Sequence, residues 1–581
     1  MTAVVFYHNR ISAKRAVMTP QLQPEETRTQ KKATPNRAWT GLAAILMAAA
    51  VLRYIGIHWG LPSELHMFSY HPDEFHSLRG VFALMTGDLN PHFFNYGSLY
   101  LYLVAFSCLI LSGGQLSLTS FDQLPRMLPE WTMIGRDVTL VAALLTVLAV
   151  YALARAIAGH RQGLLAAALC AVFPLHVLHS HYATVDVTQA LMTTVALLMA
   201  VRIYQAPRQR NYVLAGLAVG LAASVKYNGG LVLLAPLCAH LLLLRQTDRP
   251  SAPARHLWWL VGMAAVAFLL TSPYTVLDWT HAKQDIAYEL RHMREGEWPA
   301  KEADPNGYWF HAVNLTMTTC GGTFFALLGA WTLLRDRQYR SRALILLVFG
   351  LLWVVIIGAS GVRYGRYALP LVPVVAVLAA AAPLLVWRSR SEVKIAAILM
   401  MAALVSVNTY YSASLSQQLM QPDDRDRALW VIADYVPKTS DIGTVWEPWF
   451  QSPPLDYVNG GTMLRQNPLW QAFSRQIRAH RTLGLDPQAL QEAAPYAFVH
   501  SNFEVRDALR VGHHHAQEVM EVLSEQYSLV WHNPTRAPLA GMLGWAPPQD
   551  WLYPFPELAL WVRQQPPVQS DENDTSLHEA N

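Results

Sequence analysis

The chain has 581 residues, of which 53% are hydrophobic and only 14% are charged. In soluble globular proteins roughly a quarter of all residues are charged, so this composition excludes an ordinary soluble protein. The formal net charge of +4 says little by itself, because the charges are sorted between different loops. Most of the deficit in charge falls between about residues 39 and 411, whereas the chain from about residue 412 has the composition of a soluble domain.

The N-terminal 37 residues are rich in Lys and Arg and precede the first apolar run. That run shows no convincing cleavage site, so we predict an uncleaved first helix behind a cytoplasmic tail formed by residues 1–37. A helix needs about 20 apolar residues to cross the hydrocarbon core of a membrane. On this criterion, residues 38–411 form an α-helical polytopic membrane domain with about eleven transmembrane helices. The candidate spans begin near Trp39, Ile134, Gln162, Val185, Tyr212, Gly230, His256, His311, Ala343, Tyr367 and Ile395.

Clusters of Lys and Arg are expected on the cytoplasmic side of a membrane protein. In this chain every second connection between predicted spans, beginning with the N-terminal tail, carries such a cluster. The intervening loops and everything after Tyr411 are then outside. We therefore predict a cytoplasmic N-terminus, an extracytoplasmic C-terminal domain and a location in the cell (inner) membrane. The inner clusters after the first are Arg155/Arg161, Arg202/Arg208/Arg210, Arg245/Arg249/Arg255, Arg335/Arg337/Arg340/Arg342 and Arg388/Arg390/Lys394.

One apolar segment, residues 97–113, breaks this parity. Counting it as a span would place every later basic cluster outside. Its Tyr100 and Tyr102, with Tyr96 just before it, suit a membrane interface, so we predict a helix that lies on the outer face or dips into it. The first outer loop then covers residues 58–133, which is long enough to carry a function.

Residues 412–563 combine a predicted helix, residues 426–435, with three short β-type runs at residues 442–446, 496–500 and 527–531. This mixture predicts a small α/β domain. The polar stretch at residues 564–581 is rich in Asp, Glu and Asn, and it predicts a disordered tail.

Two adjacent carboxylates, Asp73 and Glu74, follow the first predicted span within the sequence HPDEFH at residues 71–76. A carboxylate near the membrane surface could accept a proton from an attacking hydroxyl, which is the work of a general base. From composition alone, a solvated loop acid is the commoner explanation. His71 and His76 could join the acids as metal ligands, but their spacing matches no strong metal motif. We therefore expect no cofactor and keep a divalent metal as the less favoured alternative.

Residues 86–102 read TGDLNPHFFNYGSLYLY. An acidic pair after the first helix, a Gly-Asp-x-Asn-Pro turn and a Tyr-x-Ser-Leu-Tyr-x-Tyr helix resemble the opening signature of the GT-C superfamily of membrane glycosyltransferases. The chain is most similar to the branch that contains the protein O-mannosyltransferases and the lipid A aminoarabinose transferases (glycosyltransferase family 39-like). Where this family usually has Arg, the chain has His181, which weakens any role for that position. Later landmarks of the resemblance, which covers roughly residues 39–411, are Gly135-Arg136, Tyr151 to Arg155, FPLH at 173–176, SHYATVD at 180–186, Lys226-Tyr227, SPY at 272–274 and RYGRYALPLVP at 363–373.

The resemblance implies an inverting glycosyltransferase with a hexosyl or pentosyl group on a polyprenyl-phosphate donor and a lipid, glycan or protein acceptor. Because the carrier lipid stays in the bilayer, transfer would take place at the extracytoplasmic surface. The leaving group is a phosphate, and its developing negative charge must be met by cations. Basic residues are scarce on the predicted outer side, so Arg363, Arg366 and Lys226 are the candidate phosphate ligands. Snorkelling at the interface is the alternative explanation for all three.

Asp73 is the candidate base, which would deprotonate an acceptor hydroxyl or amine as it attacks the anomeric carbon. Glu74 would orient Asp73 or the acceptor. Asp186 is a second outer acid that could bind sugar hydroxyls or the acceptor, or could simply cap its helix. Tyr96 and Tyr364 complete the candidate substrate-binding residues.

Two other classes of protein stay open. A secondary transporter usually has ionisable residues near mid-membrane and inverted repeats, whereas the charges here gather at span ends and no repeat is visible. A non-catalytic membrane scaffold, whose C-terminal domain binds a partner, would have no need of Asp73. Membrane lipids are expected partners and nucleic acids are not. The sequence leaves open the sugar, the acceptor and the length of the carrier.

Overall fold

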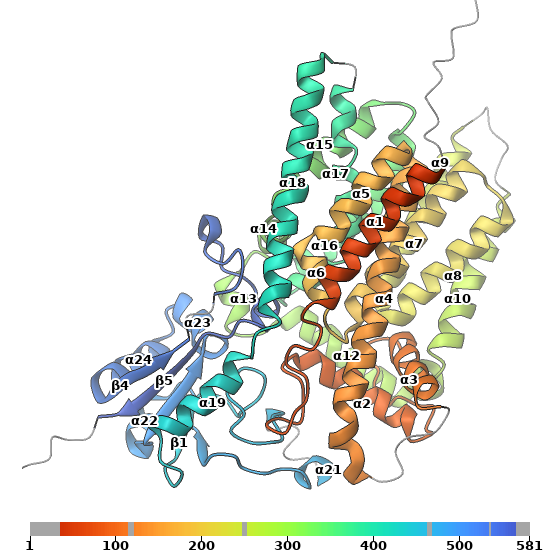
Figure 1. The fold of residues 1–581 in the computed structure, drawn as a ribbon. Coiled ribbons are helices and arrows are strands. Elements are labelled where there is room, and N and C mark those ends of the chain that lie inside the picture. The colour runs from red at the N-terminus through yellow and green to blue at the C-terminus, as the bar shows by residue number, and fades with distance from the viewer. Residues whose placement is uncertain are drawn as a thin grey trace, which may run out of the picture.

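The computed structural model describes residues 35–113, 121–246, 253–387, 389–461, 468–533 and 536–564. A bundle of upright helices occupies most of the molecule, and a small sheet domain lies beside one end of the bundle (Figure 1). Apart from residues 35–37 and 564, the two predicted tails lie outside the described residues. The helices of the bundle are α1 (Pro35–Tyr54), α4 (Leu124–Ala158), α5 (His160–Val172), α6 (Pro174–His179), α7 (Val185–Gln205), α8 (Gln209–Val225), α9 (Leu234–Leu244), α10 (Arg255–Thr271), α14 (Gly307–Thr318), α15 (Gly322–Arg335), α16 (Arg340–Ala359), α17 (Leu371–Ala379) and α18 (Ser391–Gln418).

Each of the predicted spans contains helix, but many of these helices are shorter than a full span. Within the described ranges, five helical segments are long and apolar enough to cross a membrane. A sixth span would be α14 and α15 together, which are bent by 101° where they meet. Breaks in the chain explain the shorter helices; for example, α5 ends at Val172, and Pro174 starts a new short helix directly afterwards. The apolar helical character is therefore confirmed, whereas the number of about eleven spans stays a prediction.

Close helix packing in the bundle depends on small residues. Gly216 and Gly220 of α8 face the backbone carbonyls of Leu260 and Ala264 in α10, and a Cβ atom at either glycine would collide with them. The Gly-x-x-x-Gly spacing thus serves helix packing, as membrane helices commonly use it.

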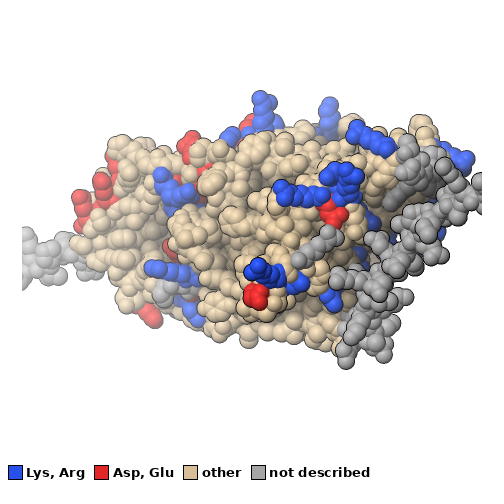
Figure 2. Space-filling view, turned by 90° about the horizontal axis from the view of Figure 1, so that it is seen from above, with Lys and Arg blue, Asp and Glu red and all other residues tan. Residues whose placement is uncertain are grey.

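The end of the bundle that is uppermost in Figure 1 carries many basic side chains. Viewed from above, Lys and Arg are spread over this face, while Asp and Glu gather mainly toward one edge (Figure 2). This distribution is the one expected of a cytoplasmic face, and the orientation of the chain in the membrane stays a prediction.

Three helices lie at the opposite end of the bundle: α2 (Pro72–Met85), α3 (Leu99–Leu111) and α12 (Trp279–Glu295). The helix expected over residues 97–113 is α3, an apolar helix of 13 residues. Its Tyr100 is fully buried and donates a hydrogen bond to the carbonyl of Gly135 in α4 (2.9 Å). This contact attaches α3 to the side of the bundle.

The C-terminal region contains a five-stranded sheet with the order β2-β1-β3-β5-β4. Strand β1 is parallel to β2 and β3, whereas β5 is antiparallel to β3 and β4. The predicted helix and the three predicted strands are confirmed as α19, β1, β3 and β4. Strands β2 and β5 were not predicted from the sequence. The elements are α19 (Asp424–Tyr435), β1 (Ile442–Thr444), β2 (His480–Thr482), α22 (Pro487–Ala493), β3 (Ala497–Ser501), α23 (Asn502–Arg510), α24 (His514–Gln526), β4 (Tyr527–His532), α25 (Gln549–Leu552) and β5 (Leu558–Arg563).

The sheet domain and the bundle share one hydrophobic core. Trp545, Trp551 and Phe555, which precede β5, are buried in the main core cluster of the bundle. The indole of Trp545 also donates a hydrogen bond to Asn314 of α14 (2.9 Å). Apolar burial of this kind is the dominant favourable term in association, so we expect the two parts to keep a fixed arrangement.

Candidate active site

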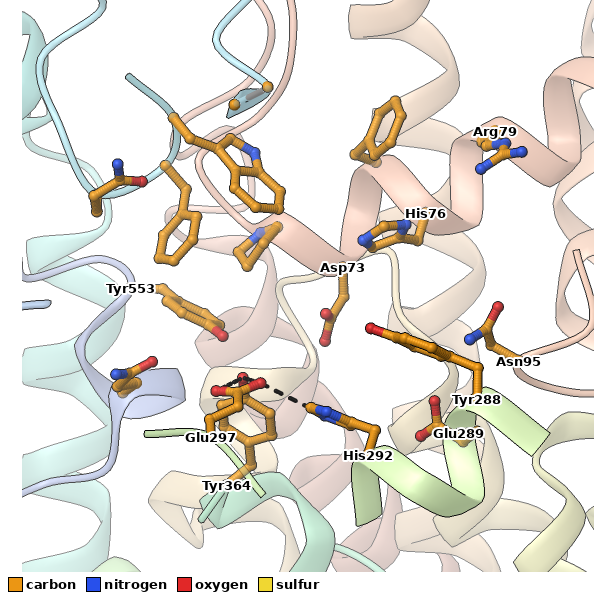
Figure 3. Close-up of a pocket in the computed structure, with 18 of the residues that line it drawn as sticks. Asp73, His76, Arg79, Asn95, Tyr288, Glu289, His292, Glu297, Tyr364 and Tyr553 are labelled. Atoms are coloured by element: carbon orange, nitrogen blue, oxygen red, sulfur yellow. Dashed lines mark hydrogen bonds and ion pairs between the residues drawn. The ribbon is translucent and has the colours of Figure 1, made fainter. Parts of the chain in front are cut away.

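A cavity of about 950 Å³ lies between the sheet domain and the lower end of the bundle. Its walls come from α2, α12, the 3-10 turn η3 (Gly365–Ala368) and loops of the C-terminal domain. Figure 3 shows that Asp73 points into this cavity, between Tyr553 on one side and Tyr288 on the other. The lining contains many aromatic rings and several carboxylates, a composition that suits a polar ligand with apolar faces.

Asp73 owes its place to the start of α2. His71 is the N-cap of this helix, and Pro72 takes the first helical position, where its missing N–H costs nothing. The His71 ring accepts a hydrogen bond from the Asp73 backbone N–H (3.3 Å). The side chain of Asp73 remains 17% exposed, so it can meet a ligand in the cavity.

Arg366 pairs with Asp73 on the cavity wall. Its Nη2 lies 2.9 Å from Asp73 Oδ2, and its guanidinium stacks over the ring of Tyr364 with its centre 3.9 Å from the ring centroid. The side chain of Arg366 is 5% exposed. Nη1 finds no hydrogen-bond partner in the parts of the chain that the structure describes. Nη1 is itself buried and lies 3.8 Å from Asp550 Oδ2, so the guanidinium is held between the carboxylates of Asp73 and Asp550.

Lys226 and Asp186 extend this group of charges behind Arg366, although neither is among the residues that line the cavity. Lys226 Nζ lies 3.1 Å from Asp186 Oδ1, and Asp186 Oδ2 lies 4.0 Å from Arg366 Nε. The ammonium of Lys226 also faces the rings of Tyr96 and Tyr367, with centroids at 5.1 and 4.8 Å. Thr184, not Asp186, is the N-cap of α7, so Asp186 is a residue of its first turn. The structure thus brings together Asp73, Arg366, Asp186 and Lys226 as alternating charges.

Glu74 lies apart from this group, although it follows Asp73 directly. It is fully buried and receives two hydrogen bonds of 2.8 Å from Arg136 of α4. It also accepts the backbone N–H of Ala183 (2.7 Å). Burial opposes its ionisation, but the Arg136 guanidinium outweighs this effect and holds the pKa of Glu74 below its ordinary value. Glu74 does not line the cavity, so the prediction that it orients the acceptor has no support in the geometry.

Arg363 makes its hydrogen bonds to backbone carbonyls outside the cavity. Its guanidinium donates to the backbone carbonyls of Asp304 (Nε, 2.6 Å) and Pro305 (Nη2, 3.1 Å), and to that of Ser360. These carbonyls take up its donors, and it is absent from the cavity wall. Of the two arginines predicted to bind phosphate, only Arg366 lines the cavity, whereas Arg363 holds the loop before α14; phosphate binding stays a prediction.

Tyr96 and Tyr364 both line the cavity. The Tyr364 hydroxyl donates to the carboxylate of Glu297 (2.7 Å), which in turn lies 3.5 Å from the His292 ring. Burial raises the pKa of the Tyr364 hydroxyl well above its usual range, so it remains a hydrogen-bond donor.

Several residues that line the cavity were not predicted from the sequence. Asp285, Tyr288, Glu289 and His292 come from one face of α12, and their spacing of three and four residues could have indicated a shared helical face. The sequence around Tyr553 gives no comparable signal, because that residue reaches the cavity only through the docking of the C-terminal domain. Across the described segments, no group of three or more His, Cys, Asp or Glu side chains could hold a metal ion. The expectation of no cofactor stays a prediction.

Comparison with known proteins links this fold to sugar-transfer enzymes. Residues 132–277 match the model of the dolichyl-phosphate-mannose-protein mannosyltransferase family. The apo oligosaccharyltransferase of Archaeoglobus fulgidus is similar over 91% of this chain and 89% of its own, with 12% identity and a TM-score of 0.51. The archaeal oligosaccharyltransferase AglB from the same organism, in complex with an inhibitory peptide and a dolichol-phosphate, matches 86% of this chain and 73% of its own, with 14% identity and a TM-score of 0.51.

ArnT from Cupriavidus metallidurans, bound to undecaprenyl phosphate, covers 91% of this chain and 98% of its own, with 13% identity and a TM-score of 0.48. No curated protein matches the sequence. Identities this low establish the fold alone. The family match over residues 132–277 and the fold shared with the archaeal oligosaccharyltransferase make this chain similar to the GT-C membrane glycosyltransferases.

Proposed function

We propose that this protein is an inverting glycosyltransferase that moves a sugar from a polyprenyl-phosphate donor to an acceptor at the extracytoplasmic surface of the membrane. The observation that carries the proposal is the contact between Asp73 and Arg366, 2.9 Å apart on the wall of a large cavity. A base and a cation held side by side are what a displacement with an anionic leaving group requires.

Arg366 and Lys226 would hold the donor phosphate. Both side chains are largely buried, where a charge-assisted hydrogen bond is stronger than it is in water. Nη2 of Arg366, which pairs with Asp73 on the cavity wall, could donate to a phosphate oxygen when the donor binds. Negative charge that develops on the leaving phosphate would then be stabilised by groups already in place.

Asp73 would act as the general base. In the structure its carboxylate is paired with Arg366, so an arriving phosphate would compete for the guanidinium and release the carboxylate for the acceptor. The acceptor oxygen or nitrogen would bond to the anomeric carbon while its proton passes to Asp73. The bond from the anomeric carbon to the phosphate oxygen would break, and its electron pair would leave with the phosphate. One displacement through an oxocarbenium-like transition state inverts the anomeric centre.

The position of the cavity supports a lipid-linked donor. It lies at the end of the bundle, where a carrier chain could stay among the lipids while its head group enters. The archaeal oligosaccharyltransferase of the same fold has been solved with a dolichol-phosphate, a ligand of the class proposed here. An acceptor could enter from the aqueous side, past the C-terminal domain.

The direct test is to incubate purified protein with a panel of radiolabelled polyprenyl-phosphate sugars and a membrane extract that supplies lipid, glycan and protein acceptors, and to measure release of the carrier phosphate. Turnover of one of these donors is the expected result. A transporter or a scaffold would release no carrier phosphate from any donor, although it could still bind the lipid. Hydrolysis or transfer from a nucleotide sugar alone would also contradict the proposal.

A further inference from the structure

Asp550 of the C-terminal domain forms hydrogen bonds with the backbone of the turn that carries Arg366. Its carboxylate is fully buried and accepts two backbone N–H groups: that of Gly365 at Oδ1 (2.9 Å) and that of Arg366 at Oδ2 (2.7 Å). The residues it joins are about 185 positions apart in the chain. This contact is thus made only when the C-terminal domain is docked on the bundle.

The same carboxylate also faces the charged end of Arg366. Oδ2 of Asp550 lies 3.8 Å from Arg366 Nη1 and 3.8 Å from the Nε2 atom of His179. A buried carboxylate is costly unless it is paired and hydrogen-bonded. Asp550 meets both requirements at one turn, which ties its position to that of Arg366.

The bundle holds the far end of this turn, where the Trp353 indole donates a hydrogen bond to the carbonyl of Tyr367 (2.8 Å), whereas Asp550 binds the end that carries Arg366. The 3-10 turn η3 has only four residues and sits between the extended backbone of Tyr364 and the start of α17. Gly365 lets the C-terminal segment approach closely, because a Cβ atom there would lie 3.1 Å from Pro548 Cγ and 3.6 Å from Asp550 Oδ1. The segment before α25 therefore packs directly on the backbone from which the Arg366 side chain extends.

We propose that Asp550 is a positioning residue: it holds η3 so that the Arg366 guanidinium is directed at Asp73 and at the donor phosphate. The inference rests on the phosphate-binding role of Arg366 in the proposed function. It makes the C-terminal domain part of the active site, because without the docked domain Arg366 would lose the backbone contacts that orient it.

A purely structural role is the alternative, since the same segment also anchors the domain through Trp545 and Trp551. The two explanations differ in what happens when Arg366 is already absent. A residue that acts through Arg366 has nothing left to position in an Arg366→Gln background, whereas a fold anchor has the same effect in both backgrounds.

The experiment measures the affinity of purified full-length protein for undecaprenyl phosphate, in wild type, Asp550→Asn, Arg366→Gln and the double variant. We expect Asp550→Asn to weaken binding by about tenfold in the wild type and by less than about twofold in the Arg366→Gln background. Asp507→Asn is the matched control. Asp507 is another buried aspartate of this domain, paired with Arg506 and Arg510, and its loss should leave the affinity within about twofold.

Gly365→Ala disturbs the same turn from the other side and should reproduce the loss of affinity if Asp550→Asn does not fold. Equal effects of Asp550→Asn in both backgrounds would overturn the inference. A cryo-EM structure of Asp550→Asn gives a readout that needs no ligand: the distance from Arg366 Nη2 to Asp73, 2.9 Å in the wild type, should increase. If the wild type binds no polyprenyl phosphate, the proposed function is wrong. The positioning role of Asp550 is then judged from the structure alone: an unchanged Arg366 in Asp550→Asn would contradict it.

Discussion

The two acids at the start of α2 form two very different ion pairs. Glu74 and Arg136 are both fully buried and meet through two hydrogen bonds of 2.8 Å. Asp73 and Arg366 meet at a similar distance, 2.9 Å, but Asp73 keeps part of its surface open to the cavity. Neighbouring residues on a helix point in directions about 100° apart. One turn of helix therefore supplies both a structural pair and a pair that a substrate can reach.

The difference lies in what completes each pair. Arg136 also donates to the carbonyls of Ile57 (2.6 Å) and Trp59 (2.7 Å), so its donors are used within the fold. Arg366 lies among three carboxylates, those of Asp73, Asp186 and Asp550, of which Asp73 faces the cavity. A pair enclosed in the fold stabilises a conformation, whereas a pair on the cavity wall can exchange one partner for a substrate group.

The largest expected effect on folding comes from breaking the buried pair. Glu74→Gln leaves the Arg136 charge buried without its counter-ion, which costs about 3–5 kcal/mol. We expect a clear fall in melting temperature and in the yield of folded protein, measured by thermal unfolding in detergent. Protein that does fold should keep its turnover number, because Glu74 does not line the cavity. Normal stability with lost turnover would show that Glu74, not Asp73, meets the substrate.

A large effect on activity, with little change in stability, is expected from Arg366→Lys. Lysine keeps the charge but loses the planar arrangement of donors that can hold Asp73 and a phosphate together. Transfer should fall by about 100-fold, as it does when one preorganised donor to a developing anion is lost. Steady-state rates with a fixed donor, beside a thermal unfolding curve, provide the check. A rate within twofold of the wild type would mean that charge alone is sufficient.

The smallest effect on activity is expected at Arg363, which the sequence ranked equally with Arg366. Arg363→Gln removes hydrogen bonds to loop carbonyls, which should lower stability by about 1–3 kcal/mol. Transfer by the folded fraction should stay within about twofold of the wild type. If Arg363→Gln instead raised the donor KM more than Arg366→Lys, the assignment of the phosphate ligand would have to be exchanged.

Local patterns predicted the parts of the molecule that local interactions determine. The helix over residues 426–435 and the strand at residues 442–446 follow from periodicity, and the structure contains both as α19 and β1. The number of spans was less accessible, because breaks such as the one before Pro174 shorten helices within apolar runs.

The same distinction between local and long-range interactions applies to the residues of the candidate site. Asp73 was recognised as an acid directly after the first predicted span and Arg366 as one of the few basic residues on the predicted outer side, and the family resemblance suggested their roles. Glu74 is removed from the cavity by its ion pair with Arg136, which is 62 positions away in the chain. Asp550 reaches Arg366 only because the C-terminal domain is docked on the bundle. Such contacts are set by tertiary packing and leave no periodic pattern in the sequence.

Side-by-side measurement of Asp73→Asn and wild type tests the central claim most directly. Both proteins would be purified in the same detergent and given the donor that the wild type turns over, and release of labelled carrier phosphate would be followed. General-base catalysis typically contributes about 100-fold to 10,000-fold, so the variant should lose at least about 100-fold in rate. Its melting temperature should stay close to normal, and its donor affinity should not fall, because the asparagine amide no longer competes with the phosphate for Arg366. The exposed Asp434→Asn in α19 is the matched control and should behave as wild type. Carrier release by Asp73→Asn at the wild-type rate would contradict the assignment of Asp73 as the base.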